Sequence, residues 1–378
     1  MIIVSPLYPP ARGGLADHTA RLAGELAKAT GVSVVTSAEA GIEPTRSVHP
    51  IIQSWRDVTA LVAALETVAP AAPVIWQYVP HMYGRGGVNL ALPRALAALR
   101  RAGRRQLVTA HEIAAPWSLW PNRLGYALAH RWQWRQILAC ADAVAFSTEA
   151  WLANWTRRAP GRQRAFFLLA SPSTIPVAPT LRDHARHWRQ QHGLDPATRV
   201  LAYFGSLSAA KQLPWVMQAW RQAQANGRPV ALVVIGERPR SDVPAELATL
   251  YKPLGYLPAP EVSAALQATD LLALPFIDGV SERRTTFMAG LSHGCAVATT
   301  FGENTGPTLR GVGCFTAVPS WDQAAFSELV TRTLADDAVR KTMGETARAV
   351  YTERYDWPVV ARALGQRLQR AKVAREGV

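Results

Sequence analysis

Long hydrophobic runs are missing from this sequence of 378 residues. No apolar stretch reaches the roughly 20 residues that a membrane-spanning helix needs. The first ten residues, MIIVSPLYPP, are apolar, but prolines interrupt them. They lack the basic beginning and the longer apolar segment of a signal peptide. We therefore predict a cytoplasmic protein.

Cysteine is also scarce. The three that occur, Cys140, Cys295 and Cys314, are scattered along the chain. Their odd number and their spacing argue against a disulfide framework and against a metal site. We expect them to be free, buried thiols.

Acidic side chains are few relative to basic ones. Lysine and arginine number 41 and aspartate and glutamate 27, a net charge of +14, and only five of the basic residues are lysines. A surface this basic favours anionic partners, which could be nucleic acid, an anionic lipid surface or a phosphorylated small molecule. The arginine bias can equally reflect genomic composition.

The first half of the sequence alternates between strand and helix patterns. With 49% hydrophobic residues the chain can build packed cores, and its length suits two domains of roughly 150–200 residues. Predicted strands occupy 1–5, 31–36, 74–78, 106–110 and 143–147, and predicted helices 15–28, 90–102 and 122–141. A proline-rich stretch, 171–179, follows and predicts a linker between domains.

The same alternation restarts after this linker. Strands are predicted at 199–204, 230–235, 271–275 and 296–299, and helices at 213–225, 259–268, from Thr285, 321–334, 337–354 and 358–372. Repeated strand–helix units indicate two doubly wound parallel sheets, which bind ligands beyond the carboxyl ends of their strands. We predict domains at 1–178 and 179–356, with a closing segment at 357–378.

The segment 274–300, LPFIDGVSERRTTFMAGLSHGCAVATT, carries the most chemical information. A buried strand ends in a loop that leads to a helix start, where free N–H groups attract anions. Arginines at this place can chelate the oxygens of a diphosphate, and a carboxylate suits a ribose or sugar hydroxyl. The candidate ligands are Ser281, Glu282, Arg283, Arg284, Thr285 and Thr286. The alternative is a capped helix with solvated charges.

This segment resembles the retaining GT-B glycosyltransferases of family 4. The family has, in this order, a strand, an acidic loop, a helix with one face of small residues and the sequence Gly-x-Pro-Val-Val-Thr. Residues 274–299 correspond to this pattern, and Gly294–Thr299 correspond to its last part. The loop 278–286 is most similar to a bacterial subgroup that reads Asp-Gly-x-Ser-x-Arg-Arg-x-Thr. The wider family carries two glutamates eight positions apart. Here they fall on Ser281 and Ala289, and Glu282 lies one place from the first.

The start of the second domain also resembles that family. Gly205, Ser206 and Lys211 correspond to its Gly-Arg-Leu…Lys-Gly, whose Arg and Lys hold the donor phosphates, with Ser206 in place of the arginine. Gly236 resembles the next glycine turn of the family. Tyr256 lies in a segment that resembles the family's loop against the nucleobase, which implies contact with the base. A plain turn with an exposed lysine, and a packing role for Tyr256, are the alternatives.

In the first domain, Gly13 and Gly14 follow the first strand and resemble the family's Gly-Gly loop, which implies a place across the cleft from the diphosphate. His111 and Glu112 end a strand and are similar to the family's Thr-x-His-Asp, whose histidine lies near the transferred sugar. We assign His111 a positioning role rather than nucleophilic attack. His18, on the helix after the glycines, is either an acceptor contact or a packing residue.

The aromatic, glycine-rich stretch 77–87 follows a strand and is predicted to line the acceptor side. Its candidates are Tyr78, His81, Tyr83 and Arg85, and an ordinary packed loop is the alternative. The stretch 116–135 combines four tryptophans with arginines. It could lie in a lipid interface, but we favour burial of these tryptophans in the core.

The combined prediction is an α/β protein of GT-B fold, with two Rossmann-like domains, that transfers a hexose from a UDP- or GDP-sugar to a glycan or lipid-linked acceptor. The resemblance implies that the sugar keeps its anomeric configuration and that no metal ion is needed. The sequence contains no Asp-x-Asp metal signature. No cofactor is expected, and peripheral contact with an anionic membrane is considered. The alternatives are a nucleotide-sugar epimerase, a non-catalytic scaffold subunit and a nucleic-acid-binding protein. The missing glutamate pair is the main support for a scaffold. The sequence contains no nucleic-acid-binding motif that would support the third.

Overall fold

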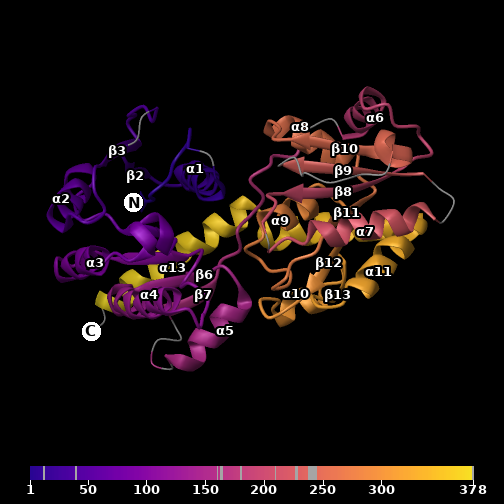
Figure 1. Ribbon diagram of the computed structural model, residues 1–378. Coiled ribbons are helices and arrows are strands. Elements are labelled where there is room, and N and C mark those ends of the chain that lie inside the picture. Colours follow the sequence, from indigo (N-terminus) through magenta and orange to yellow (C-terminus); the bar gives the residue numbers. More distant parts are fainter. Residues whose placement is uncertain are drawn as a thin grey trace. The chain divides into compact units, whose positions relative to one another are not determined.

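A computed structural model describes residues 1–11, 13–38, 41–159, 161, 165–178, 181–208, 210–225, 229–236 and 245–376. Arg12 of the glycine loop lies outside these residues. The chain forms two compact units (Figure 1). Unit 1 comprises Met1–Ser147, Trp151–Ala170 and Trp357–Val378, and unit 2 comprises Thr148–Ala150 and Ser171–Asp356.

Unit 1 is built on a parallel sheet of seven strands in the order β3-β2-β1-β4-β5-β6-β7. The order reverses between β1 and β4, as in doubly wound folds. The strands are β1 (Ile2–Val4), β2 (Ser33–Ser37), β3 (Val48–Ile52), β4 (Val74–Tyr78), β5 (Gln106–Ala110), β6 (Ala143–Phe146) and β7 (Phe166–Leu168).

Helices cover both faces of this sheet (Figure 1). One face packs against α2 (Val58–Val68), α3 (Ala91–Arg101), α4 (Pro121–Cys140) and α5 (Glu149–Arg158), with Trp76 and Trp134 in its core. The other packs against α1 (Gly14–Ala27) and the last helix, α13 (Trp357–Glu376). Leu15, Leu22 and Leu26 form the buried stripe of α1, at the spacing of one helix face. Short turns η1 (Pro80–Met82) and η2 (Arg85–Gly87) follow β4.

Unit 2 repeats this design with six parallel strands in the order β10-β9-β8-β11-β12-β13. The order again reverses once, here between β8 and β11, which defines the switch point of the sheet. The strands are β8 (Arg199–Gly205), β9 (Val230–Gly236), β10 (Tyr251–Gly255), β11 (Leu271–Leu274), β12 (Val297–Phe301) and β13 (Thr316–Pro319). Two parallel α/β sheets confirm the predicted fold class.

The helices of unit 2 also lie on both faces of its sheet. On one face, α7 (Leu213–Gln224) and α11 (Gln323–Ala335) bury Trp220 and Phe326. The opposite face carries α9 (Thr285–Ser292), whose Gly290 lies so close to Leu272 that a Cβ would be 2.6 Å from it. The remaining elements are α6 (Leu181–Gln191), η4 (Ala245–Leu250), α8 (Ala259–Gln267), α10 (Pro307–Gly311), α12 (Asp337–Val350) and the π-helical turn η5 (Tyr351–Tyr355).

The division between the units falls at Ala170–Ser171, ahead of the predicted boundary at residue 178. The intervening segment belongs to unit 2 because its backbone is bonded there. Ser171 N donates to Glu282 O at 2.9 Å, and Ser173 N to the Tyr351 hydroxyl at 3.1 Å. At the far end, the chain returns to unit 1 at Trp357.

The tryptophan-rich stretch before and within α4 differs from its prediction. Of its four tryptophans only Trp134 lies in the core, whereas Trp117, Trp120 and Trp132 are exposed. The prediction of a core role for these three is therefore wrong. The reason is that α4 buries one stripe, which includes Trp134 and Ile137, and Trp132 lies on its opposite side.

The three cysteines differ in burial, and the described helices differ from membrane spans. Cys295 and Cys314 are buried as predicted, and Cys140 is half-buried. Within the described ranges, no helix combines the length and the apolar character that spanning a membrane requires.

Candidate functional site

The loops after β8 and β11 meet at the switch point of unit 2. Gln212 N donates to Pro275 O at 3.0 Å, Ile277 N donates to Ala210 O at 3.1 Å, and Lys211 and Phe276 form a bridge between these two contacts. This pairing brings Lys211 to the start of the loop 276–284. Two predicted clusters, far apart in sequence, therefore share one edge of the sheet.

Gly205 provides the floor of this edge. Its φ of +135° lies in the region that favours glycine, and a Cβ here would fall 2.1 Å from Lys211 Nζ and 3.3 Å from Thr286 Cγ2. The ammonium group of Lys211 therefore lies directly over the Gly205 backbone. Gly236, its neighbour in the β8–β9 register, is equally constrained, because a Cβ would lie 2.4 Å from Gly205 O.

Arg283 and Arg284 converge on one carboxylate in the same loop. Arg283 Nη2 donates to Asp278 Oδ2 at 2.8 Å, and Arg284 Nη2 donates to Asp278 Oδ1. Asn304 Nδ2 also donates to Asp278 Oδ2 at 2.8 Å, and the Arg284 guanidinium lies 4.5 Å from the centre of the Phe276 ring. Asp278 thus fixes both guanidinium groups before any anion arrives.

The electrostatics of this cluster favour an anion. Burial alone would raise the pKa of Asp278, but Arg284 and Arg283 outweigh it and hold that pKa below its usual value. The carboxyl is therefore ionised at neutral pH. Among the described residues, two guanidinium groups share the single carboxylate of Asp278, so this group of three side chains keeps one positive charge in excess.

The start of α9 adds main-chain donors to this cluster. The cap position is Arg284, and no side chain accepts a hydrogen bond there. Helix α9 begins at Thr285, as predicted, with Thr285 and Thr286 as its first residues and not as its cap. A helix end without a side-chain cap leaves its first N–H groups to a ligand or to water.

Ser281 and Glu282 lie deeper than predicted. Both side chains are fully buried, and Ser281 Oγ and Glu282 Oε1 have no hydrogen-bond partner among the described residues. Glu282 Oε2 accepts one long contact, 3.4 Å, from Glu149 N. The structure does not support Glu282 as a ready contact for a ribose, because solvent does not reach its carboxyl.

This burial makes the Glu282 carboxyl sensitive to pH. Burial raises its pKa to about 7 from an ordinary value of 4.5, and the nearby charge of Glu149 adds to the effect. A carboxyl whose pKa is raised by folding stabilises the protein below pH 4.5, and this stabilisation is lost as the pH rises through 7.

We therefore expect Glu282→Gln to increase the free energy of unfolding by up to about 3 kcal/mol at pH 8, with little change at pH 5. Urea unfolding at the two pH values measures this difference. Glu345→Gln, at an exposed position on α12, is the matched control and should change the free energy of unfolding by less than about 0.5 kcal/mol. A destabilisation by Glu282→Gln at pH 8 would contradict this assignment of the buried charge.

Two further predicted donor contacts of unit 2 are accessible. Ser206 is exposed after β8. Tyr256 follows β10 and is 72% exposed, so a packing role for this ring is excluded. An exposed ring beside the carboxyl end of a strand is free to stack on a flat partner.

In unit 1, the rings of half-buried His111 and buried His18 lie against each other. Their ring centroids are 4.8 Å apart, and the His18 ring also contacts Trp357 of α13 at 5.2 Å. His111 Nε2 lies 2.5 Å from Gln77 Oε1, so Nε2 carries the proton and Nδ1 is the acceptor. Burial lowers the pKa of His111 to about 4. This imidazole is neutral at pH 7, which suits positioning by hydrogen bonds more than proton transfer.

The other predicted residues of unit 1 separate into exposed and buried groups. Gly13, with a φ of +150°, precedes α1, Gly14 begins it, and a Cβ at either would meet no atom within 4 Å. Glu112 is exposed beside His111. His18 is buried, and its Nδ1 has no partner among the described residues.

Tyr78 and Tyr83 are core residues. The Tyr78 hydroxyl accepts a hydrogen bond from Gln133, and the Tyr83 hydroxyl donates to Gln77 O at 2.8 Å. Their role as acceptor contacts is not supported, because both rings are buried. His81 and Arg85 remain available, since both are exposed after β4.

Sequence reasoning missed two residues that organise these clusters. Asp278 was read only as part of the loop, although a carboxylate five and six positions before two arginines signals their partner. Gln77 interrupts the otherwise apolar strand β4 and lies in register with Thr109 of β5. Across the described residues, no group of three His, Cys, Asp or Glu side chains is arranged to hold a metal ion.

Comparison with known proteins gives a family match for part of the chain. Residues 198–336 match the family Glycosyl transferases group 1. This part of the chain is therefore similar to a group 1 glycosyltransferase domain. It contains Gly205, Lys211, Asp278, Arg283 and Arg284, which we call the Lys211–Arg284 cluster. No curated protein matches the chain in sequence.

Solved structures resemble the whole chain in fold. Sucrose-phosphate synthase from Thermosynechococcus elongatus superposes with a TM-score of 0.70 and 17% identity, and the match covers 99% of each chain. HepE from Anabaena in complex with UDP-glucose gives a TM-score of 0.67 at 16% identity, over 98% of this chain and 99% of that one. Trehalose-phosphate synthase from Burkholderia xenovorans gives 0.68 at 13%, over 97% and 99%. These likenesses confirm the two-domain GT-B fold.

Proposed function

We propose that the protein is a retaining glycosyltransferase that moves a hexose from a UDP- or GDP-sugar to a glycan or lipid-linked acceptor without a metal ion. The observation that carries this proposal is the cluster at the switch point of unit 2. Lys211, Arg283, Arg284 and the start of α9 gather cationic and N–H donors beside the glycine floor of Gly205.

The chemistry needed is stabilisation of a leaving diphosphate. Charge develops on the diphosphate as the bond to the sugar breaks, and donors already fixed in place stabilise it without reorganisation. Asp278 holds the two guanidinium groups in position for this role. Three protein cations supply charge that other transferases take from a metal. Proteins of the same fold that bind UDP-glucose or form UDP support a nucleotide sugar as donor.

Unit 1 supplies the acceptor side in this proposal. His111, neutral and held by Gln77, positions a sugar hydroxyl through Nδ1. Glu112, His81 and Arg85 are exposed on the same unit and are further candidate contacts, whereas His18 is buried and packs against His111. In this proposal Arg283 and Arg284 act as hydrogen-bond donors to the ligand, in place of the carboxylate contacts of the missing glutamate pair.

The first test is thermal unfolding with a panel of UDP-, GDP- and ADP-sugars, each with magnesium and with EDTA. A ligand that binds only the folded state raises the unfolding midpoint. We expect one nucleotide series to raise the midpoint equally in magnesium and in EDTA. Release of the nucleoside diphosphate should then require an acceptor. Binding without turnover over a broad acceptor panel would favour a scaffold, and sugar isomerisation without acceptor would favour an epimerase.

A further inference from the structure

The start of α4 and the segment before it expose an unusual set of apolar side chains. Leu119 is 100% exposed and Trp120 71%. Among the described residues, no other stretch of similar length exposes so many large hydrophobic groups. The full set is Trp117, Leu119, Trp120, Leu124, Tyr126, Leu128 and Trp132. Contiguous exposed apolar surface of this kind marks an interaction site.

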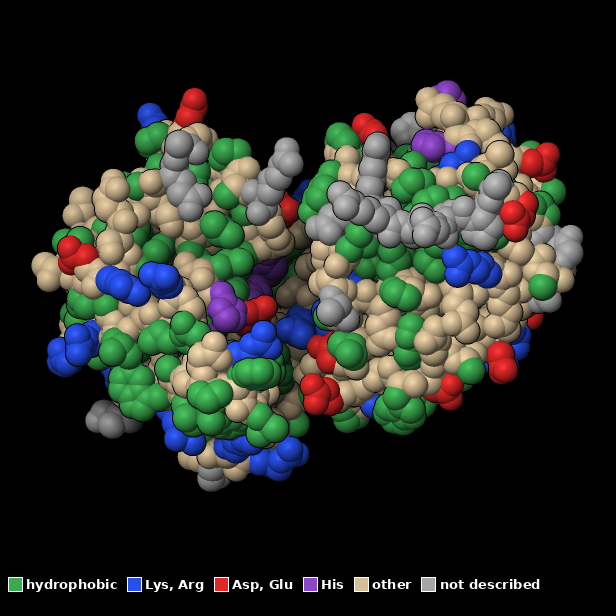
Figure 2. All heavy atoms as spheres, viewed as in Figure 1, with side chains coloured by type: hydrophobic (Ala, Val, Ile, Leu, Met, Phe, Trp, Pro, Cys, Tyr) green, Lys and Arg blue, Asp and Glu red, His purple; other side chains and the backbone are tan. Residues whose placement is uncertain are grey.

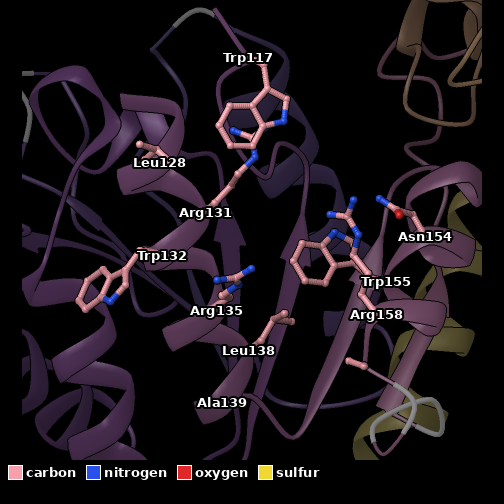
Figure 3. A pocket seen from close by; sticks show the side chains of 11 residues that line it. Trp117, Leu128, Arg131, Trp132, Arg135, Leu138, Ala139, Asn154, Trp155 and Arg158 are labelled. Atoms are coloured by element: carbon pink, nitrogen blue, oxygen red, sulfur yellow. The ribbon is translucent and has the colours of Figure 1, made fainter. Parts of the chain in front are cut away.

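A groove of about 1200 Å³ adjoins these side chains, between α4 and α5 (Figure 3). Its walls are apolar and cationic. Trp117 and Arg131 lie together at one end, and Trp155 and Arg158 lie farther along, near Arg135 and Leu138 (Figure 3). We call Trp117–Trp132 and this groove the α4 surface. In the space-filling view, hydrophobic and basic side chains lie side by side over α4 and α5 (Figure 2).

The charges of the α4 surface have one sign. Helix α4 contains no aspartate or glutamate. Arg131, Arg135 and Arg158 form no ion pair within the described part of the chain. Burial, followed by the nearby charge of Arg158, lowers the pKa of Arg131, which indicates that like charges are held close together. Such a surface is complementary to an array of anionic groups.

Two of these arginines are also fixed against aromatic rings. The Arg131 guanidinium lies 3.8 Å from the centre of the Trp117 ring and donates to Ala115 O and Ala127 O, both at 2.9 Å. Arg158 lies 5.8 Å from the centre of the Trp155 ring. Tryptophan rings with cationic neighbours are typical of the boundary between lipid headgroups and acyl chains.

We propose that the α4 surface docks the protein onto an anionic lipid bilayer. Leu119 and Trp120 enter the acyl boundary, and Arg131, Arg135 and Arg158 contact headgroup phosphates. A nucleic acid would satisfy the arginines but would leave Leu119 and Leu124 against a polar backbone, so the apolar tip favours lipid. The transfer reaction is not needed for this docking, so the two proposals fail independently.

The test is co-sedimentation of the full chain with vesicles at 0.1 M salt. One set contains phosphatidylcholine alone, and the other contains phosphatidylcholine with one-third phosphatidylglycerol. We expect binding to the anionic vesicles that weakens with added salt and at least about tenfold weaker binding to the neutral ones. Arg135→Glu with Arg158→Glu should lower binding at least about tenfold. Leu119→Ser with Trp120→Ser should weaken binding even at low salt.

Matched controls separate this surface from net charge and from loss of folding. Arg332→Glu with Lys341→Glu reverses two exposed charges on unit 2, and Trp321→Ser removes an exposed tryptophan there. Both controls should bind anionic vesicles like the wild type, and all variants should keep the unfolding midpoint. Equal loss in the controls, or no binding to anionic vesicles, would overturn the proposal. Tight binding of single-stranded DNA that the Arg variants abolish, without vesicle binding, would assign the surface to nucleic acid instead.

Discussion

Replacing Lys211 or Arg284 by alanine is expected to lower kcat/KM for the nucleotide sugar by about 10²–10³. Each substitution removes one fixed cation from the place where charge develops on the leaving diphosphate. The Lys211 ammonium lies over Gly205, and the Arg284 guanidinium is held by Asp278 and Phe276. Steady-state kinetics with the donor found in the nucleotide panel measures the effect.

A matched control accompanies these variants. Lys341→Ala removes an exposed lysine on α12 of the same unit and should leave kcat/KM unchanged. If Lys211→Ala retained wild-type turnover while folding normally, Lys211 would have no part in transfer, and the plain-turn alternative for 205–211 would hold.

Gly205→Ala is expected to impair both folding and donor binding. Its φ of +135° disfavours any residue with a Cβ, at a cost of about 1–2 kcal/mol in the free energy of unfolding. The new methyl group would also occupy the place of Lys211 Nζ, 2.1 Å away, and push the ammonium off the floor of the site. Donor affinity should therefore fall at least about tenfold, beyond what the stability loss explains.

The control for Gly205→Ala is a glycine whose Cβ has room. Gly24, inside α1, meets no atom within 4 Å, so Gly24→Ala should raise the free energy of unfolding by about 0.5–1 kcal/mol. Urea unfolding and donor titration on both variants separate strain from displacement of the lysine. A Gly205→Ala protein that binds donor like the wild type would show that Lys211 does not contact the ligand.

The sequence predicted the inner strands of both sheets and missed all four edge strands. β4 and β5 were predicted with the observed bounds, because buried strands are continuous apolar runs. The missed strands are β3, β7, β10 and β13, and each lies at the edge of its sheet. Prolines in β3 and β10, the three-residue length of β7 and the half-buried pattern of β13 hide them. An edge strand forms by pairing with the strand next to it, so its own residues carry a weaker strand pattern.

The candidate site could be predicted in part, for a similar reason. The motif at 278–286 and Lys211 were found because charged residues beside a helix start and a glycine turn have few structural uses. The sequence did not predict which of these side chains are buried in the fold. Tyr78 and Tyr83 carry hydroxyls suited to sugars, yet core partners already bond them. Trp120, by contrast, was assigned to the core on hydrophobicity alone and is exposed.

The central claim is that the Lys211–Arg284 cluster of unit 2 binds the diphosphate of the donor. Calorimetric titration of the wild-type protein with a nucleoside diphosphate and with the same nucleoside tests it most directly, both in EDTA. Charge-assisted hydrogen bonds contribute about 1.5–3 kcal/mol each, so the diphosphate should bind at least about 100-fold more tightly. The advantage should shrink in Lys211→Ala and Arg284→Ala. Equal affinity for diphosphate and nucleoside would contradict the account.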